Sequence, residues 1–179
     1  IIVSCGVNSA NPHYLGKPEE KLKAKQPIVI DLYPRSLEKR YWADMTRTIV
    51  KGSAPRKIKK MFEVVLEARD TCIDMLHEGV PGSEVYNLCC DIMEKAGYKT
   101  MRGGKRIEGG FLHGLGHGVG LEIHEGPYLN EAYKFPLKEH NIVTIEPGLY
   151  DPKIGGVRIE DILSNFQSWE GCLLYTSDA

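Results

Sequence analysis

The stretch that decides the fold class is residues 55–97, PRKIKKMFEVVLEARDTCIDMLHEGVPGSEVYNLCCDIMEKAG. Apolar residues recur in it at steps of three and four, which predicts one buried face of an amphipathic helix. That face consists of Ile58, Met61, Phe62, Val65, Ala68, Cys72, Met75 and Leu76. Gly79 ends the first apolar pattern, and a second begins just beyond it. The stretch therefore predicts two helices, at about 55–77 and 83–95.

Short apolar runs lie on both sides of this helix pair. Their length and β-branched content predict strands. The predicted strands are 1–5, 28–32 and 41–50 before the helices, and 119–124, 141–146 and 156–163 after them. The glycine-rich, basic residues 98–112 are predicted to form a loop or hairpin. Strands, then two helices, then strands again indicate an α+β fold.

Composition limits what the chain does. Its 179 residues suffice for one domain with a sizeable core. A net charge of −1 gives no reason to expect nucleic acid or an anionic membrane as a partner. No apolar run approaches the roughly 18–20 residues that a membrane span needs. The five cysteines include no C-x-x-C pair, which indicates free thiols and a cytoplasmic location rather than a zinc–thiolate site.

Four carboxylates lie in or beside the predicted strands, among Val, Ile and Leu. Burying a carboxylate there is costly unless it is paired or bound to a cation. A single one would indicate a salt bridge or an exposed strand face. Four need a shared source of positive charge, and Arg47 and Arg158 are too few to supply it. The four are Asp31, Asp44, Glu146 and Glu160.

Histidines gather in residues 113–125, HGLGHGVGLEIHE. A lone histidine is more often structural, but three of them separated by glycines favour a binding site, because glycine lets a ligand approach the backbone closely. Carboxylates together with imidazoles suit Mn²⁺, Co²⁺, Fe²⁺ or Zn²⁺. Two such ions would neutralise four negative charges, make a hydroxide nucleophile and polarise a carbonyl oxygen. The predicted chemistry is therefore hydrolytic.

Four motifs occur in a fixed order: DMTRT at 44–48, HGLGHGVGLEIHE at 113–125, TIEPGLY at 144–150 and GVRIED at 156–161. Over about residues 1–165 the chain thereby resembles the pita-bread metallopeptidases, family M24, which include methionine aminopeptidases, aminopeptidase P and prolidase. The Thr-Arg-Thr after Asp44, Arg158 and the His113/His117 pair resemble the proline-specific branch. The resemblance implies a pita-bread fold with two halves related by a pseudo-twofold axis. It also implies a peptide substrate cleaved at an Xaa-Pro bond, and a possible homodimer.

The resemblance also implies a shell for two divalent metal ions, with Mn²⁺ expected and Co²⁺, Fe²⁺ or Zn²⁺ as options. Asp31 would be a bidentate ligand of one ion. Asp44 and Glu160 would bridge the two ions. His117 and Glu146 would complete the shell of the other ion.

Further roles come from the same resemblance. Glu146 would move a proton from the attacking water to the leaving amine. His124 would stabilise the tetrahedral intermediate. His113 and His13 would bind the substrate, with His113 on the proline side. Arg158 would hold one of the bridging carboxylates from behind.

Two departures from the family pattern stand out. The hairpin between Asp31 and Asp44 is two residues longer than the commoner form, an even number that keeps both carboxylates on one face but alters substrate access. The chain is also expected to be truncated. Residues 1–167 would be a catalytic domain without its first helix pair or any N-terminal domain, and 168–179 a non-native tail.

Two other functions are compatible with this fold: a creatinase-type amidinohydrolase, and a non-catalytic module that binds peptides, histones or RNA. Both kinds of relative tend to lose metal ligands, whereas all five positions are filled here. The complete set favours the hydrolase. The sequence leaves open aminopeptidase versus dipeptidase action, the native metal and the oligomeric state.

Overall fold

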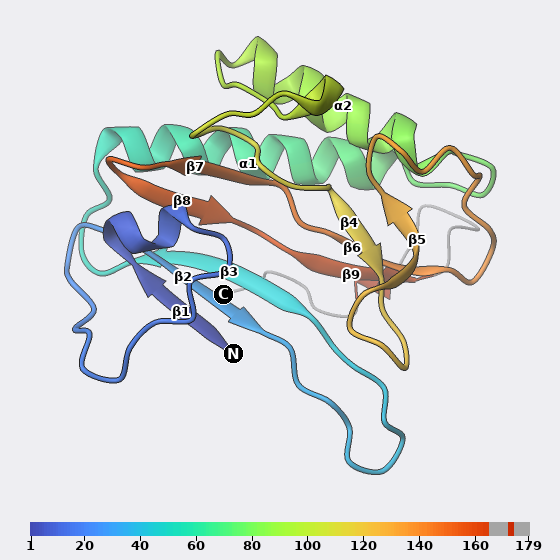
Figure 1. Ribbon diagram of the computed structural model, residues 1–179, viewed down its shortest axis with the longest axis horizontal. Helices are drawn as coiled ribbons and strands as arrows, with labels where there is room; N and C mark the ends of the chain where they lie inside the picture. The colour runs from blue at the N-terminus through green and yellow to red at the C-terminus, as the bar shows by residue number, and fades with distance from the viewer. Residues whose placement is uncertain (165–171, 174–179) are drawn as a thin grey trace.

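The computed structural model describes residues 1–164 and the backbone of 172–173 (Figure 1). The predicted tail, 168–179, lies outside the described residues except for the two-residue strand β10. The elements in chain order are β1 (Ile2–Cys5), the 3-10 helix η1 (Gly6–Ala10), β2 (Pro27–Leu32), β3 (Met45–Val50), α1 (Arg56–Met75), α2 (Gly82–Lys95), the 3-10 helix η2 (Arg102–Gly104), β4 (Gly116–Gly118), β5 (Glu125–Leu129), β6 (Ile142–Ile145), β7 (Gly148–Asp151), β8 (Gly155–Arg158), β9 (Asp161–Ser164) and β10 (Cys172–Leu173).

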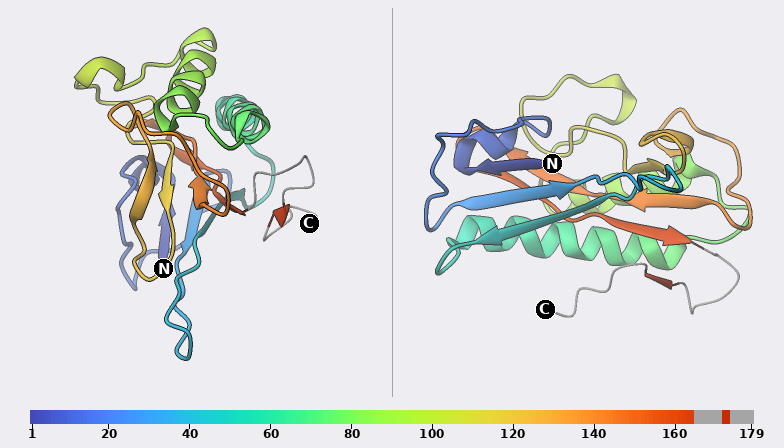
Figure 2. Two further views of the ribbon diagram at one scale, coloured as in Figure 1. Left: turned by 90° about the vertical axis from the view of Figure 1, so that its right-hand side faces the viewer. Right: turned by 90° about the horizontal axis from the view of Figure 1, so that it is seen from below.

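The strands form three antiparallel sheets with the orders β1-β2-β3, β10-β9-β6-β4-β5 and β7-β8. An isolated bridge between Thr46 and Glu160 joins the first sheet to the residue before β9. The hydroxyl of Ser9 in η1 accepts a hydrogen bond from the backbone N–H of Gly156 in β8, at 2.8 Å. Residues far apart in sequence therefore meet where the sheets join, which Figure 2 shows from two further sides.

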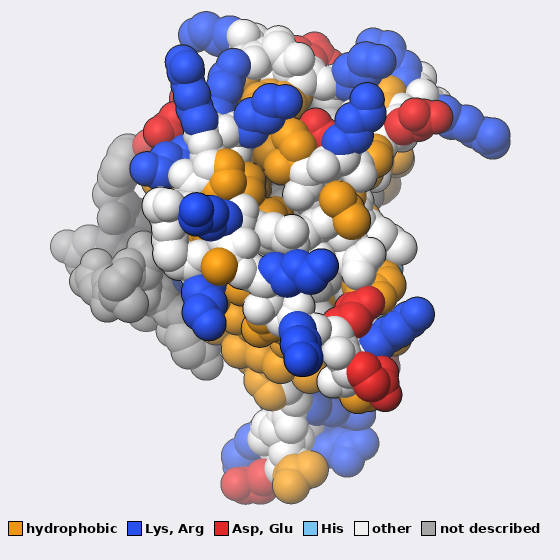
Figure 3. Space-filling model, turned by 90° about the vertical axis from the view of Figure 1, so that its left-hand side faces the viewer, with side chains coloured by type: hydrophobic (Ala, Val, Ile, Leu, Met, Phe, Trp, Pro, Cys, Tyr) orange, Lys and Arg blue, Asp and Glu red, His pale blue; other side chains and the backbone are white. Residues whose placement is uncertain are grey.

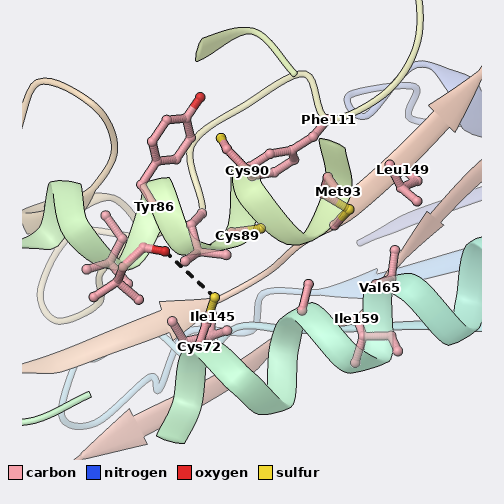
Figure 4. Close-up of a cluster of buried hydrophobic side chains, with 14 of the residues drawn as sticks. Val65, Cys72, Tyr86, Cys89, Cys90, Met93, Phe111, Ile145, Leu149 and Ile159 are labelled. Atoms are coloured by element: carbon pink, nitrogen blue, oxygen red, sulfur yellow. Dashed lines mark hydrogen bonds between the residues drawn. The ribbon is translucent and has the colours of Figure 1, made fainter. Parts of the chain in front are cut away.

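Both helices lie on the same side of the strands, with α1 running along the sheets and α2 packed over it (Figure 1). Their apolar faces meet the strands in one core, part of which is drawn in Figure 4. Val65 and Cys72 of α1, Met93 of α2, and Phe111 and Leu149 are each completely buried there. Burying one large apolar side chain of this kind stabilises a fold by about 1.5–3 kcal/mol. The three- and four-residue spacing thus predicted both helices, to within a few residues at their ends.

The predicted strand at 119–124 is wrong. The chain there makes a bend between β4 and β5, and the pairing of these strands shifts between His117 and Gly118. Gly118 permits the close backbone approach at this bend, since a Cβ at this position would lie 2.5 Å from the backbone oxygen of Gly126. The close approach that glycine permits therefore replaces a continuous strand with a tight loop.

Two other predicted strands are interrupted. The strand predicted at 41–50 begins only at Met45, and the residues before it belong to a hairpin. The strand predicted at 156–163 is divided into β8 and β9 by Ile159 and Glu160. Both interruptions lie beside a predicted metal ligand, so the chain changes direction where it presents Asp44 and Glu160.

Charge is distributed unevenly although the net charge is small. Figure 3 shows Lys and Arg side chains gathered over the end of the molecule at which α1 begins. The first turn of α1 contains no acidic residue, and its basic side chains are exposed: Arg56, Lys57, Lys59 and Lys60. Carboxylates, by contrast, concentrate inside the pocket described below.

None of the described helices is long and apolar enough to cross a membrane.

Candidate metal centre and active site

The five side chains predicted to bind metal come from separate elements and line one pocket of about 510 Å³. Asp31 is in β2, Asp44 directly precedes β3 and His117 is in β4. Glu146 follows β6, and Glu160 lies between β8 and β9. Four of the five are nearly inaccessible, and Glu160 is only 2% exposed. The junction of the sheets therefore gathers these side chains into one small volume.

Their donor atoms form overlapping groups of three. The ligand atoms of Asp31, Asp44 and Glu160 lie within 4.8 Å of one another. The same holds for His117, Glu146 and Glu160, and for Asp44, His117 and His124. Each of these groups could hold a cation, and Glu160 belongs to two of them.

The ring of His117 is oriented by its own backbone. Its Nδ1 lies 3.0 Å from the carbonyl oxygen of Gly118, which can only accept, so Nδ1 carries a hydrogen. Nε2 then points at carboxylates, 3.2 Å from Glu146 Oε1 and 3.8 Å from Asp44 Oδ2. Although burial lowers it, the pKa of His117 is raised by the hydrogen bond and charge of Glu146 and by the charge of Asp44. Nε2 thus faces oxygens that favour a cation, either a proton or a metal ion.

The carboxylates themselves resist ionisation without a cation. Burial, followed by the charges of Asp31 and Glu146, raises the pKa of Asp44 to about 7. Burial and neighbouring carboxylates also raise the pKa of Glu160 well above its usual value. Burial raises the pKa of Asp31, although the guanidinium of Arg158 opposes it.

Two further observations fit bound cations. Asp31 Oδ1 is buried and has no hydrogen-bond partner. Within the described part of the chain, the only basic side chains in ion-pair contact with the four pocket carboxylates are Arg158 and His117. Oxygen donors with one imidazole suit Mn²⁺ and its neighbours in the first transition row. The residues present therefore fit bound divalent metal.

The stability of the metal-free protein is expected to fall as pH rises from 6.5 to 8. A carboxyl group whose pKa is raised by folding stabilises the fold below its unfolded pKa, and this contribution is lost as pH rises through the folded pKa. For Asp44 the window runs from 3.8 to about 7. Stability is lost with rising pH at three other groups as well, because folding also raises the pKa values of Asp31, Glu160 and His117. We expect a loss on the order of 1–2 kcal/mol across this interval, visible as a fall in Tm.

His113 and His124 act in the opposite direction because burial lowers their pKa values. Their effect falls mainly below pH 6.5, outside the chosen interval. Adding Mn²⁺ at pH 8 should restore the Tm by binding the folded state. A Tm that is flat between pH 6.5 and 8, or that ignores Mn²⁺, would count against the cation site.

A chain of hydrogen bonds runs behind the pocket carboxylates. Arg158 is 4% exposed and donates from Nη2 to Asp31 Oδ2 at 2.6 Å and from Nη1 to the Tyr150 hydroxyl at 3.0 Å. Arg158 was predicted to hold one of the bridging carboxylates, Asp44 or Glu160. That partner is wrong, because the guanidinium of Arg158 binds Asp31 instead. It reaches Glu160 only through Thr46, whose hydroxyl accepts from Arg158 Nε and donates to Glu160 Oε2.

The same chain fixes His113. Its Nδ1 lies 2.7 Å from the carbonyl oxygen of Gly114 and therefore carries a hydrogen. Burial lowers the pKa of His113, so the ring is neutral and Nε2 is an acceptor. The Tyr150 hydroxyl, 2.8 Å away, donates to it. Both ring nitrogens are thus engaged by the protein, and His113 presents to the pocket a ring whose orientation is set by Tyr150.

Replacing Tyr150 with Phe is expected to destabilise the protein by about 1–3 kcal/mol, because a donor on Arg158 and an acceptor on His113 lose their buried partner. We also expect a loss of about 10- to 100-fold in affinity for Mn²⁺, the usual effect of removing a group that orients a ligand. Thermal unfolding and a titration with Mn²⁺ would measure the two. Tyr41→Phe is the control, since Tyr41 is 58% exposed. Equal effects of the two substitutions would contradict the role given to the Tyr150 hydroxyl.

The remaining predicted residues lie at the pocket wall. The ring of His124 packs edge-on against that of His117, with 4.3 Å between ring centroids. Burial and the charge of His117 lower the pKa of His124, so that it is neutral near pH 7. His13 is exposed in the loop that follows η1 and also lines the pocket. The structure therefore brings all nine sequence-predicted site residues to one place.

Sequence reasoning missed three residues that support the carboxylates. Thr46 binds Glu160, as described above. Arg47 donates from Nη1 to the backbone oxygen of Glu160 at 2.7 Å and from Nη2 to Asp161 at 2.5 Å. Tyr150 links Arg158 to His113. All three occur inside the motifs DMTRT and TIEPGLY, and Arg47 was considered only as a source of positive charge. The signal was therefore in the sequence, but these contacts were not predicted from it.

An α+β fold of this topology, with an acidic pocket at the junction of its sheets, defines a pita-bread protein. The chain belongs to metallopeptidase family M24, whose model matches residues 1–164. The fold prediction is confirmed by solved structures. The prolidase from Pyrococcus horikoshii OT3 superposes with a TM-score of 0.86 and 37% identity, covering 99% of this chain and 47% of that one. The X-Pro aminopeptidase from Thermotoga maritima gives a TM-score of 0.85 and 32% identity, covering 98% and 46%.

Similar proteins have related names. A protein of Pyrococcus furiosus named Xaa-Pro dipeptidase is 39% identical over 160 residues, which are 89% of this chain and 42% of that protein. A putative Xaa-Pro aminopeptidase of Mycoplasma pneumoniae is 38% identical over 164 residues, 90% of this chain and 43% of that protein. The chain thus spans less than half the length of these relatives.

Proposed function

We propose that the full-length protein is a metal-dependent hydrolase that cleaves the Xaa-Pro bond at the N-terminus of peptides or in dipeptides. The observation that carries the proposal is the pair of ligand groups sharing Glu160 in one buried pocket. Membership of family M24 and relatives named Xaa-Pro dipeptidase and Xaa-Pro aminopeptidase support it.

Two divalent ions, with Mn²⁺ as the first choice and Co²⁺, Fe²⁺ or Zn²⁺ as options, would be held by the five clustered side chains. Asp31, Asp44 and Glu160 would hold one ion. His117 and Glu146 would hold the other, together with Asp44 and Glu160. When bound, the ions would supply a hydroxide nucleophile at neutral pH and polarise the scissile carbonyl.

Glu146 is the proposed proton carrier. Burial would raise its pKa, but the hydrogen bond with His117 and the charges of His117 and Arg158 lower it. The carboxylate is therefore ionised at neutral pH and able to accept a proton from the attacking water. It would then give this proton to the nitrogen of the leaving proline, which must be protonated to depart.

The other side chains would bind and orient the substrate. His124 is neutral and exposed at the pocket wall, where it would hydrogen-bond to the oxygen that becomes negative during attack. His113 and His13 would contact the peptide, His113 through a ring held by Tyr150. Arg158 would keep Asp31 ionised and in place through its hydrogen bond.

Two alternatives are less well supported. A creatinase-type amidinohydrolase works without metal and has no need for five converging ligands. A non-catalytic binding module would gain nothing from gathering four carboxylates in one pocket, where burial and then the charges of Asp31 and Glu146 raise the pKa of Asp44 to about 7. We place the protein in a reducing compartment such as the cytoplasm, since Cys5, Cys72, Cys89 and Cys90 are free thiols.

The bond that is cleaved can be tested with four peptides: Ala-Pro, Gly-Pro-Pro, Arg-Pro-Pro and Met-Ala-Ser. Full-length protein loaded with Mn²⁺ should hydrolyse the Xaa-Pro bonds, and a chelator should prevent it. The ratio of dipeptide to tripeptide turnover would then separate a dipeptidase from an aminopeptidase. Cleavage of Met-Ala-Ser alone would overturn the proline specificity, and no cleavage by folded, metal-loaded protein would favour a binding module.

A further inference from the structure

A long hairpin joins β2 to β3, and residues 33–43 of it are called the hairpin arm below. It extends from the first sheet well beyond the body of the molecule (Figure 1). Backbone hydrogen bonds from Ser36 to Tyr41 and from Ala43 to Pro34, both 2.9 Å, hold its two sides together. At its tip Leu37 is 92% exposed. The arm is therefore an ordered ribbon with a free tip, and its base lies at the pocket.

Two aromatic side chains at the base of the arm line the pocket, Tyr33 and Trp42. Tyr33 lies two residues after Asp31, and Trp42 two residues before Asp44. Alternate residues of an extended chain face the same side. Tyr33 therefore faces the same side as Asp31, and Trp42 the same side as Asp44. Ile123, next to His124, also lines this pocket. The carboxylates are thus bordered by an apolar wall made of Tyr33, Trp42 and Ile123.

The position of Trp42 is fixed by contacts on two sides. Its backbone N–H donates to the carbonyl oxygen of Gly120 at 2.9 Å, which ties the arm to the loop that carries His124. The guanidinium of Arg35 lies 5.3 Å from the centre of its ring, a cation–π contact. Arg35 is itself held by the backbone oxygens of Arg40 and Leu121. The half-buried indole is therefore held in place before a substrate arrives.

We propose that Trp42 is a specificity-determining residue, and that the wall it forms with Tyr33 and Ile123 binds the side chain of the N-terminal residue of the peptide. The preferred substrates are then peptides with a large apolar residue before proline. This inference rests on the proposed function. A rigid aromatic wall gives large contact area at low entropic cost, so it favours Leu or Phe over Gly or Ala.

The wall meets the N-terminal residue rather than the residue after proline because the scissile bond must lie at the ligand cluster. His113 is assigned to the proline side of that bond, whereas Trp42 is tied to the loop that carries His124. The N-terminal residue then lies on the side of the cluster where Tyr33 and Trp42 line the pocket. The chain after the scissile bond then leads away toward His113.

The test compares Gly-Pro, Ala-Pro, Leu-Pro and Phe-Pro as substrates of full-length, Mn²⁺-loaded protein. For the wild type we expect kcat/KM to be higher for Leu-Pro and Phe-Pro than for Gly-Pro. In Trp42→Ala the ratio of kcat/KM for Leu-Pro or Phe-Pro to kcat/KM for Gly-Pro should fall by about tenfold. The fall should come mainly from a higher KM for Leu-Pro and Phe-Pro, because an apolar contact surface is lost. Trp42→Phe, which keeps an aromatic surface, should restore most of the preference. Leu37→Ala at the exposed tip is the matched control and should leave the ratio unchanged.

Ile123→Ala is a second test of the wall if Trp42→Ala fails to fold. It should also lower the kcat/KM ratio of Leu-Pro or Phe-Pro to Gly-Pro. An unchanged ratio in folded Trp42→Ala and Ile123→Ala would overturn this inference while leaving Xaa-Pro hydrolysis intact. A changed preference for the residue after proline in Gly-Pro-Xaa peptides, without a change at the N-terminal residue, would also overturn it. If the wild type cleaves no Xaa-Pro bond at all, the proposed function fails and the inference fails with it.

Discussion

Replacing Asp44 with Asn is expected to leave the full-length protein with at most one tightly bound metal ion per chain and to lower kcat/KM for Ala-Pro by more than about 100-fold. Removing a group that only orients a ligand already costs about 10- to 100-fold, and Asp44 itself belongs to two of the three ligand groups. Metal analysis after gel filtration, followed by steady-state kinetics, would measure both effects.

The same substitution should have the opposite effect on the metal-free protein. Burial and then the charges of Asp31 and Glu146 raise the pKa of Asp44 to about 7. The cost of ionising this carboxyl group is absent in the amide, so metal-free Asp44→Asn should be more stable than metal-free wild type at pH 8. Lost metal together with gained stability is a result that general misfolding would not give. Asp74→Asn, at an exposed position of α1, is the matched control. Full metal content and activity in Asp44→Asn would contradict the assignment.

Replacing Glu146 with Gln is expected to lower kcat by about 100- to 10,000-fold, the range for loss of a general acid–base group. Glutamine keeps the size of the side chain and an oxygen that can accept from Thr144, which lies 3.4 Å from Glu146 in the structure. It is unable to carry a proton from water to the leaving nitrogen. Rates would be compared at equal metal content, because Glu146 is also a proposed ligand.

Glu63→Gln, at an exposed position of α1, controls for the loss of one negative charge. The wild-type kcat should fall only below the usual pKa of a carboxyl group, because the surroundings of Glu146 lower its pKa. In Glu146→Gln the small remaining rate should lose this acid limb. A variant with wild-type kcat and normal metal content would remove Glu146 from the proton transfer.

The sequence predicted best where a single periodicity controls the structure. The helices of 55–97 were predicted because their buried faces recur every three to four residues, and packing on the sheets does not change that spacing. The four pocket carboxylates were singled out because carboxylates among apolar residues are costly without a cation, and the family resemblance supplied their proposed roles as ligands together with His117. Motif order then placed the chain in a family, which the comparison confirmed.

Prediction failed where glycine and tertiary contacts override local preference. Residues 119–124 were predicted as a strand from their length and β-branched content, but Gly118 allows the close backbone approach of a bend that brings His124 back against His117. The partner of Arg158 was misassigned because the residue that a long guanidinium reaches depends on how β8 packs against β2. The interactions of Tyr150 and Trp42 were not predicted, since both depend on residues distant in sequence that only the fold brings near.

The most direct test of the two-metal account is the rate of Ala-Pro hydrolysis as Mn²⁺ is titrated back into chelated full-length protein. The account predicts almost no hydrolysis without metal, and a rate that reaches its plateau only as the second equivalent per chain binds. Hydrolysis of Ala-Pro at the full rate without metal, or a plateau after a single equivalent, would contradict it.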